Sequence, residues 1–229
     1  MTLTLIEKRK EAGDAESFIF RPDQPLSWRA GQFLHYTLPQ PSPDDRGIER
    51  WFTISSAPFE EHVMLTTRIV DKRSTFKAGL DALPVGGTIE ADGLEGDFTA
   101  DDPKAEFVFI AGGIGITPYR AILMDLDRRG VEISATLLYA NRTNDFVFKE
   151  ELEALAARHR NFRIRYIVDP EKIDEPTIRG VAPDLAAPVF YVSGPEPMVE
   201  AFEKMMLGTG IPDAHLKRDF FPGYQWPLR

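Results

Sequence analysis

The chain has 229 residues, of which 43% are hydrophobic and 28% are charged, with a net charge of −9 and no cysteine. This composition is typical of a globular protein with one large domain or two small ones. The negative charge argues against non-specific binding to nucleic acids or anionic membranes. Without cysteine the chain forms no disulfide and supplies no thiolate to zinc or an iron–sulfur cluster. Its four histidines are scattered, so we expect no metal site.

Membrane and export signals are not expected. No apolar run approaches the ~18 residues that a membrane helix needs, and the first residues lack the apolar core of a signal peptide. We therefore expect no membrane insertion and a cytoplasmic protein.

The first hundred residues have the pattern of an all-β unit. Short β-rich runs recur between turn residues such as Pro22-Asp23 and Val85-Gly86-Gly87. Such spacing is typical of a small antiparallel barrel or sandwich. A short helix fits residues 75–83. The expected strands cover residues 2–7, 17–21, 33–38, 51–55, 63–70 and 88–91.

A polar joint at residues 99–104 precedes an alternation of strands and helices. This alternation predicts right-handed crossovers and a parallel sheet. Ligands of such sheets gather at the carboxyl ends of the strands, where the turns at 112–115 and 193–195 fall. The expected strands cover residues 107–111, 131–139, 162–168, 189–192 and 216–220, and the expected helices cover residues 119–129, 149–160 and 197–207.

The turn after residues 107–111 has the pattern of an anion site. The preceding apolar run predicts a strand buried on both faces. Gly112, Gly113 and Gly115 permit conformations that other residues avoid, Thr117 fits a helix N-cap, and Pro118 fits the first helical turn. The N–H groups of an open helix N-terminus bind a nucleotide pyrophosphate. The motif is Gly-x-Gly-x-x-Pro and not the full dinucleotide fingerprint, so a tight turn without a ligand stays open.

A second candidate site lies in the first half, where Arg50, Trp51, Phe52 and Thr53 are consecutive. On a strand, Arg50 and Phe52 share one face and Thr53 lies on the other. An arginine for phosphate, a ring for stacking and a hydroxyl for a ring nitrogen are the groups that recognise a flavin. The alternative is an edge strand with a solvated arginine and a core phenylalanine.

Together and in this order, these stretches resemble the ferredoxin–NADP reductase family of flavoproteins over nearly the whole chain. The resemblance implies two domains. An antiparallel β-barrel that binds FAD would cover residues 1–100, and an α/β domain with a parallel sheet that binds NAD(P), ending in an aromatic tail, would cover residues 101–229. It also implies that Arg50 holds the flavin phosphates, that Phe52 packs on the isoalloxazine, and that Thr53 hydrogen-bonds near its reactive N5.

Further motifs extend the resemblance along the chain. They are a segment over the flavin pyrophosphate (Arg68, Ile69, Val70, Ser74 and Thr75), a glycine turn (93–98), the nicotinamide pyrophosphate loop (112–118), Ser193-Gly194-Pro195 beside the nicotinamide, and Gly223-Tyr224 near the flavin. Ser193 stands where the family has cysteine. Either Tyr224 or Trp226 covers the second face of the flavin, and the sequence does not choose between them.

The resemblance implies an NAD(P)H-dependent flavoprotein reductase. Hydride would pass between the nicotinamide and the flavin, and single electrons would pass to or from a separate carrier protein such as a ferredoxin, a flavodoxin or an oxygenase component. Thr53, Ser193 and Tyr224 are the expected catalytic residues. FAD is expected rather than FMN. NADP and NAD both remain open, with Arg142 favouring the 2′-phosphate of NADP.

Three other functions stay open at this stage. The chain could reduce a free flavin or ferric iron as a small-molecule acceptor, serve as a non-catalytic flavoprotein module of a larger complex, or be a binding domain that has lost flavin. Docking of an acidic carrier favours a basic patch. The candidates for that patch are Arg9, Lys10, Lys72, Arg73 and Lys77.

Overall fold

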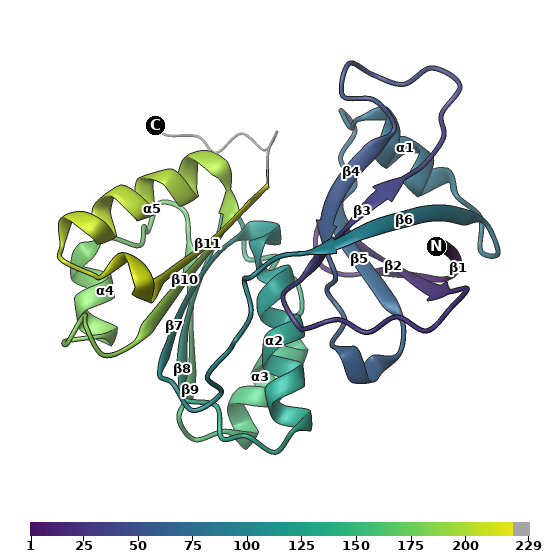
Figure 1. The fold of residues 1–229 in the computed structure, drawn as a ribbon. Helices are drawn as coiled ribbons and strands as arrows, with labels where there is room; N and C mark the ends of the chain where they lie inside the picture. Colours follow the sequence, from purple (N-terminus) through teal and green to yellow (C-terminus); the bar gives the residue numbers. More distant parts are fainter. Residues whose placement is uncertain (222–229) are drawn as a thin grey trace.

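The computed structural model describes residues 1–221. It holds two sheets, one antiparallel and curled, the other parallel and flanked by helices (Figure 1). The two-part fold expected from the sequence is confirmed. Tyr224 and Trp226, one of which the resemblance places over the flavin, lie outside the described residues.

The antiparallel sheet has six strands in the order β4-β3-β6-β1-β2-β5. In β1, Leu3 and Leu5 are buried between more exposed neighbours, which places one face of the strand on an apolar core. The edge strands meet at one point, because the Ser55 N–H donates to the Met64 carbonyl at 2.8 Å. The curled sheet therefore forms a barrel. Its elements are β1 (Thr2–Lys10), β2 (Ala15–Pro22), β3 (Phe33–Thr37), β4 (Glu49–Thr53), the 3-10 turn η1 (Pro58–Glu60), β5 (Val63–Arg68), α1 (Thr75–Ala82) and β6 (Thr88–Glu95).

The parallel sheet has five strands in the order β11-β10-β7-β8-β9. Helices α2 and α3 cover the face toward the barrel, and α4 and α5 cover the opposite face (Figure 1). Its elements are β7 (Phe107–Gly112), the 3-10 turn η2 (Gly113–Ile116), α2 (Thr117–Arg128), β8 (Ala135–Asn141), α3 (Lys149–Arg158), β9 (Phe162–Val168), α4 (Glu175–Val181), β10 (Val189–Pro195), α5 (Glu196–Gly208), the 3-10 turn η3 (Asp213–His215) and β11 (Leu216–Phe221).

The two parts pack directly on each other. Ile19 and Met64 of the barrel belong to the same apolar cluster as Ile122 of α2. This shared cluster fixes α2, and the glycine turn before it, against the barrel. Within residues 1–221, no helix is long and apolar enough to span a membrane.

Two local expectations were wrong. The strand expected from residue 131 begins at Ala135, because the preceding segment brings the chain back from α2 and buries Ile133 in the core, where its N–H lies 3.4 Å from the His159 Nδ1. Helix α4 was not expected, since its seven residues include a proline and a glycine and show no helical periodicity. Asp174 caps it by accepting a hydrogen bond from the Thr177 N–H at 2.9 Å.

Candidate active site

The glycine turn at the carboxyl end of β7 is held by close backbone approaches. A Cβ at Gly115 would lie 2.2 Å from the Ser193 carbonyl oxygen, so only glycine lets η2 pack on β10. Gly113 has a φ of +55°, which glycine adopts without strain. A Cβ at Gly112 would meet the Met198 sulfur at 2.2 Å. These contacts explain the glycines without a ligand and also place the turn at the sheet edge where ligands bind.

Thr117 is not the N-cap that the sequence predicts. The turn η2 comes between the glycines and the helix, so Ile116 is the N-cap, and Thr117 and Pro118 are the first two residues of α2. Proline suits the first helical turn because it has no N–H to pair. The helix N-terminus still faces the site, because Thr117 lines the adjoining cleft.

A cleft of about 750 Å³ lies where the barrel meets the parallel-sheet part. The barrel contributes β4, the end of β5 and the start of α1. The other part contributes Ile114, Thr117, Arg218, Asp219 and Phe220. The expected site residues that line it are Arg50, Phe52, Thr53, Val70, Ser74 and Thr117. The cleft therefore joins the flavin motif of the first half to the helix that follows the glycine turn.

Strand β4 presents two aromatic rings to this cleft. Phe52 is half-buried, with its ring centroid 6.0 Å from that of Tyr36 and 5.8 Å from that of Phe76. Trp51 is 61% exposed, and its ring stacks on His35 at 4.9 Å. Sequence reasoning named Phe52 as the stacking ring and missed Trp51, whose position directly beside the motif was the available signal. Because successive residues of a strand point to opposite faces, a flat cofactor in the cleft can stack on only one of the two rings.

One end of the cleft is strongly cationic. Arg46, Arg50, Lys72, Arg73 and Lys77 line it together with Ser74, the N-cap of α1. Several cations beside a helix N-terminus favour phosphate groups. The cleft thus has the aromatic walls, the hydroxyl of Thr53 and the phosphate-binding end that a flavin nucleotide requires.

Arg50 is buried and already engaged by its own loop. Its Nη1 donates to the carbonyls of residues 46, 47 and 49, and its Nη2 donates to Asp44 Oδ1 at 3.0 Å. The other carboxylate oxygen of Asp44 accepts from the Thr75 N–H at 2.9 Å, at the start of α1. The hydrogen bond from Thr75, aided by Arg46 and Arg50, lowers the pKa of Asp44. A carboxylate therefore lies between the two groups that the sequence assigns to the flavin phosphates.

Arg68 lies beside the glycine turn and not in the cleft. Its Nη1 donates to Asp14 at 2.5 Å, and its Nη2 donates to Asn141 Oδ1 at 3.1 Å, at the end of β8. A Cβ at Gly113 would lie 3.5 Å from the same Nη2. The barrel thus supplies a cation to the sheet edge, where the sequence places a nucleotide pyrophosphate. Ile69, next in the chain, packs on the barrel core.

Ser193 is fully buried in β10 and donates its Oγ hydrogen to Asp219 Oδ2 of β11 at 3.1 Å. Burial raises the pKa of Asp219 to about 6, against the lowering effect of this hydrogen bond. Asp219 lines the cleft, so the pair connects the sheet interior with the space beside Thr53. Sequence reasoning missed Asp219, although an acid inside the strand expected over residues 216–220 was a usable signal.

The remaining expected residues lie around the glycine turn. A Cβ at Gly194 would lie 3.3 Å from the Gly112 Cα, so β7 and β10 approach closely there. Pro195 ends β10, and Arg142 follows β8 at the same sheet edge. These residues do not line the cleft, and neither do Arg68, Ile69, Thr75, Gly112, Gly113, Gly115, Pro118, Ser193 and Gly194.

Known proteins are similar to this chain in sequence. Residues 109–204 match a family described as an oxidoreductase NAD-binding domain. The chain is 31% identical over 196 residues to the reductase component DmpP of phenol 2-monooxygenase from Pseudomonas sp. strain CF600, covering 78% of this chain and 53% of that protein. It is 28% identical over 234 residues to the ferredoxin reductase component of 3-ketosteroid-9-alpha-monooxygenase from Mycolicibacterium smegmatis, covering 96% of this chain and 65% of that protein.

A solved structure shows the same fold. The cytochrome P450 reductase GcoB of Amycolatopsis superposes with a TM-score of 0.83 at 23% identity, over 96% of this chain and 70% of that one. The chain spans only 53% to 65% of the length of the two sequence relatives named above.

Proposed function

Because this chain belongs to the ferredoxin–NADP reductase family, we propose that it is an NAD(P)H-dependent reductase that uses FAD and exchanges electrons with a separate carrier protein. The observation that carries the proposal is the shared cleft. Thr53 of the barrel lines it together with Asp219, which is hydrogen-bonded to Ser193 in the parallel sheet. Groups for both cofactors thus meet in one space.

Bound FAD would supply the hydride acceptor, and the chain's own residues would position it. In this proposal, the Thr53 hydroxyl offers a hydrogen bond to the flavin ring, while Phe52 provides its stacking surface. The cationic end with Arg50 and Ser74 takes the phosphates. Asp219, held by Ser193 behind it, bounds the place of the nicotinamide. Exclusion of water and close approach of the two rings are what the protein contributes to the rate.

We assign Arg68 to the nicotinamide nucleotide, in place of the flavin role that its motif implies. Its guanidinium lies beside Gly113 at the sheet edge and outside the flavin cleft. The loop at 112–118 and Arg142 complete this proposed nucleotide site. Arg142 supports a preference for NADP, since an arginine at this edge suits a 2′-phosphate.

The proposed partner is a ferredoxin, a flavodoxin or an oxygenase component. Support comes from the relatives, which are described as reductase components of monooxygenases. Residues 1–100 form the FAD-binding domain and residues 101–229 the NAD(P)-binding domain in this proposal. The proposed location is the cytoplasm, where reduced nicotinamide nucleotides are available.

An anaerobic absorbance spectrum, taken before and after separate additions of NADPH and NADH, tests the proposal. We expect a flavin spectrum that bleaches on mixing, faster with NADPH, and that recovers when an oxidised ferredoxin is added. Bound flavin that neither nucleotide bleaches would instead identify a non-catalytic module. Recovery only with free flavin or ferric iron would identify a small-molecule acceptor. Absence of flavin after incubation with FAD and FMN would contradict the proposal.

A further inference from the structure

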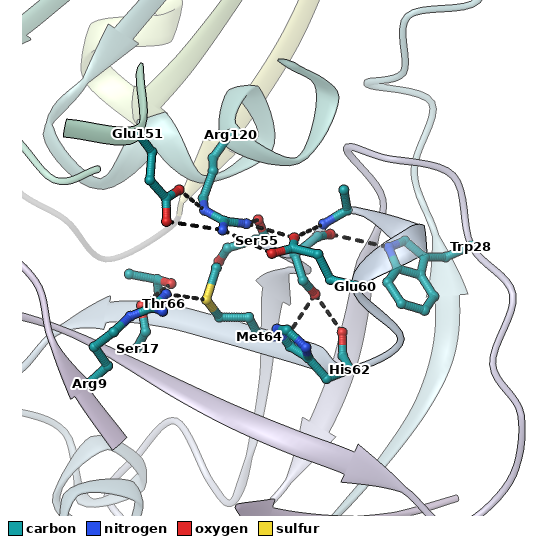
Figure 2. Close-up of polar contacts among 12 residues, drawn as sticks. Arg9, Ser17, Trp28, Ser55, Glu60, His62, Met64, Thr66, Arg120 and Glu151 are labelled. Atoms are coloured by element: carbon teal, nitrogen blue, oxygen red, sulfur yellow. Dashed lines mark hydrogen bonds and ion pairs between the residues drawn. The ribbon is translucent and has the colours of Figure 1, made fainter. Parts of the chain in front are cut away.

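Arg120 is a buried arginine that none of the functions assigned above uses. It lies in the first turns of α2, three residues after Thr117, and it is 3% exposed. Arginine is rarely buried unless it is paired, because desolvating its charge is costly. Its surroundings come from both parts of the molecule, as Figure 2 shows.

The guanidinium of Arg120 uses all of its nitrogens as donors. Nη1 donates to Glu60 Oε2 at 2.9 Å and to the Ser55 carbonyl at 3.0 Å, and Nη2 donates to Glu60 Oε1 at 3.0 Å. Nε donates to Glu151 Oε2 at 2.6 Å, and Nη2 also donates to Glu151 Oε1 at the longer distance of 3.3 Å. Glu60 and Ser55 belong to the barrel, whereas Glu151 belongs to α3 beside Arg120. One side chain therefore bonds across the boundary by a two-pronged contact, which fixes both distance and angle.

The barrel side of this contact is itself rigid. Glu60 Oε2 also accepts the Ala57 N–H at 2.6 Å, so the carboxylate is tied to the turn η1. Burial raises the pKa of Glu60, but the hydrogen bonds and the charge of Arg120 outweigh it and hold the pKa below its ordinary value. The side chain of Glu60 is 15% exposed and that of Glu151 is 36% exposed. The barrel contact is thus the better shielded of the two.

The contact joins the two segments that face each other across the cleft. Ser55 follows Thr53 by two residues, and its N–H pairs with Met64 to close the barrel. On the other side, Arg120 follows directly on the turn η2 and the start of α2, which carry Ile114 and Thr117 into the cleft. A shift of Arg120 relative to Ser55 would therefore change the separation of the flavin motif from the nucleotide loop.

We propose that Arg120, through Glu60 and the Ser55 carbonyl, is a positioning residue that sets the separation of the two cofactor sites. The inference rests on the proposed function, because the cleft has this meaning only if a flavin and a nicotinamide react in it. Misplacement of reacting groups by about 1 Å can cost about 100-fold in rate. The contact therefore acts on hydride transfer and leaves the binding of each cofactor largely intact.

The test compares two isosteric variants, each of which removes the charge of one carboxylate that pairs with the Arg120 guanidinium. Glu60→Gln removes the ion pair with the barrel and leaves the hydrogen bond to the Ser55 carbonyl, and Glu151→Gln is the matched control inside the parallel-sheet part. At saturating nucleotide, we expect Glu60→Gln to slow flavin reduction about 10- to 100-fold. We expect Glu151→Gln to slow it less than about threefold, because its partly exposed pair contributes little. The dissociation constants for flavin and nucleotide are expected to change less than about twofold in both variants.

A second measurement needs no cofactor. Hydrogen exchange of residues 113–120 in the flavin-free protein is expected to rise about tenfold in Glu60→Gln but not in Glu151→Gln, with exchange in β2 unchanged as the sign of intact global stability. If neither NADPH nor NADH reduces the wild-type flavin, the proposed function fails, and the exchange comparison still decides the role of Arg120.

Arg120→Lys keeps the charge and loses the two-pronged geometry, so it serves if Glu60→Gln does not fold. We expect it to slow flavin reduction and to raise the exchange of residues 113–120 in the same direction as Glu60→Gln. Equal effects of Glu60→Gln and Glu151→Gln would overturn the inference. An unchanged rate of flavin reduction together with unchanged hydrogen exchange in Glu60→Gln would also overturn it. The same holds for a loss of rate in Glu60→Gln that weaker cofactor binding explains entirely.

Discussion

Replacing Asp219 by asparagine is expected to stabilise the protein above pH 6 and to have a much smaller effect in acid. Burial raises the pKa of Asp219 to about 6 in the folded protein, whereas its ordinary value is 3.8. The unfolded chain therefore loses this proton at a lower pH than the folded protein does. As a result the wild type loses stability as the pH rises from about 4 to about 6, and the loss is complete above that range. At 1.36 kcal/mol per pH unit, the gap between 3.8 and 6 corresponds to at most about 3 kcal/mol, because Asp219 is only half-buried and lines the cleft.

Urea unfolding of the wild type and Asp219→Asn at several pH values measures this effect. Between pH 4.5 and pH 8, the difference in unfolding free energy is expected to grow by up to about 2 kcal/mol in favour of the variant, because part of the effect lies below pH 4.5. Asp23→Asn, at an exposed turn position, controls for the loss of one negative charge. A difference that stays constant to within about 0.5 kcal/mol over this range would refute the idea that Asp219 is a desolvated carboxyl.

Three further predictions concern the cofactor sites. Gly115→Ala should destabilise the chain by about 1–3 kcal/mol, because the added Cβ would lie 2.2 Å from a β10 carbonyl oxygen. The control Gly208→Ala should not destabilise it, because no atom lies within 4 Å of the added Cβ. Thermal unfolding compares the two variants, and equal melting temperatures would contradict the packing argument. Arg68→Ala should raise the nucleotide dissociation constant about 10- to 100-fold and leave flavin affinity unchanged; weaker flavin binding would return this residue to the flavin. Asp44→Asn should tighten FAD binding about tenfold, because a neutral amide competes less with a phosphate for Arg50 and the Thr75 N–H. The control Asp45→Asn, at the exposed neighbouring position, should leave FAD binding unchanged. Unchanged or weaker FAD binding by Asp44→Asn in a fluorescence titration would show that the Asp44 carboxylate does not compete with the phosphate.

Much of the fold could be predicted because each part follows a simple burial rule. The alternation of buried and exposed residues in β1 and the wholly buried run of β7 distinguish an antiparallel barrel from a covered parallel sheet. The rule failed at residues 131–134, where Val131 and Ile133 imitate strand alternation but pack beneath helices. Short elements such as α4 depend on a cap and on tertiary contacts, which periodicity does not record.

The candidate site could be predicted only in part. Arg50, Phe52 and Thr53 lie within four residues of one strand, so the sequence alone places them together. Arg68 is separated from the cleft by the direction of its side chain, which the packing of the two parts determines. Asp219 and Arg120 find partners 26 and 60 residues away in the chain, and no spacing rule connects such distant positions. Asp44 competes for groups that the motif assigns to a phosphate, which only the folded loop reveals.

The most direct test of hydride transfer in the shared cleft is a single-turnover reduction under anaerobic conditions with NADPH deuterated on one face of the nicotinamide or on the other. A nicotinamide stacked on the flavin in the proposed site would turn only one of its faces toward the flavin, so we expect bleaching to slow with one of the two deuterated nucleotides and to keep the unlabelled rate with the other. Equal bleaching rates with all three nucleotides at saturation would contradict hydride transfer as the step that this cleft governs, and absence of bleaching would contradict the reductase function itself.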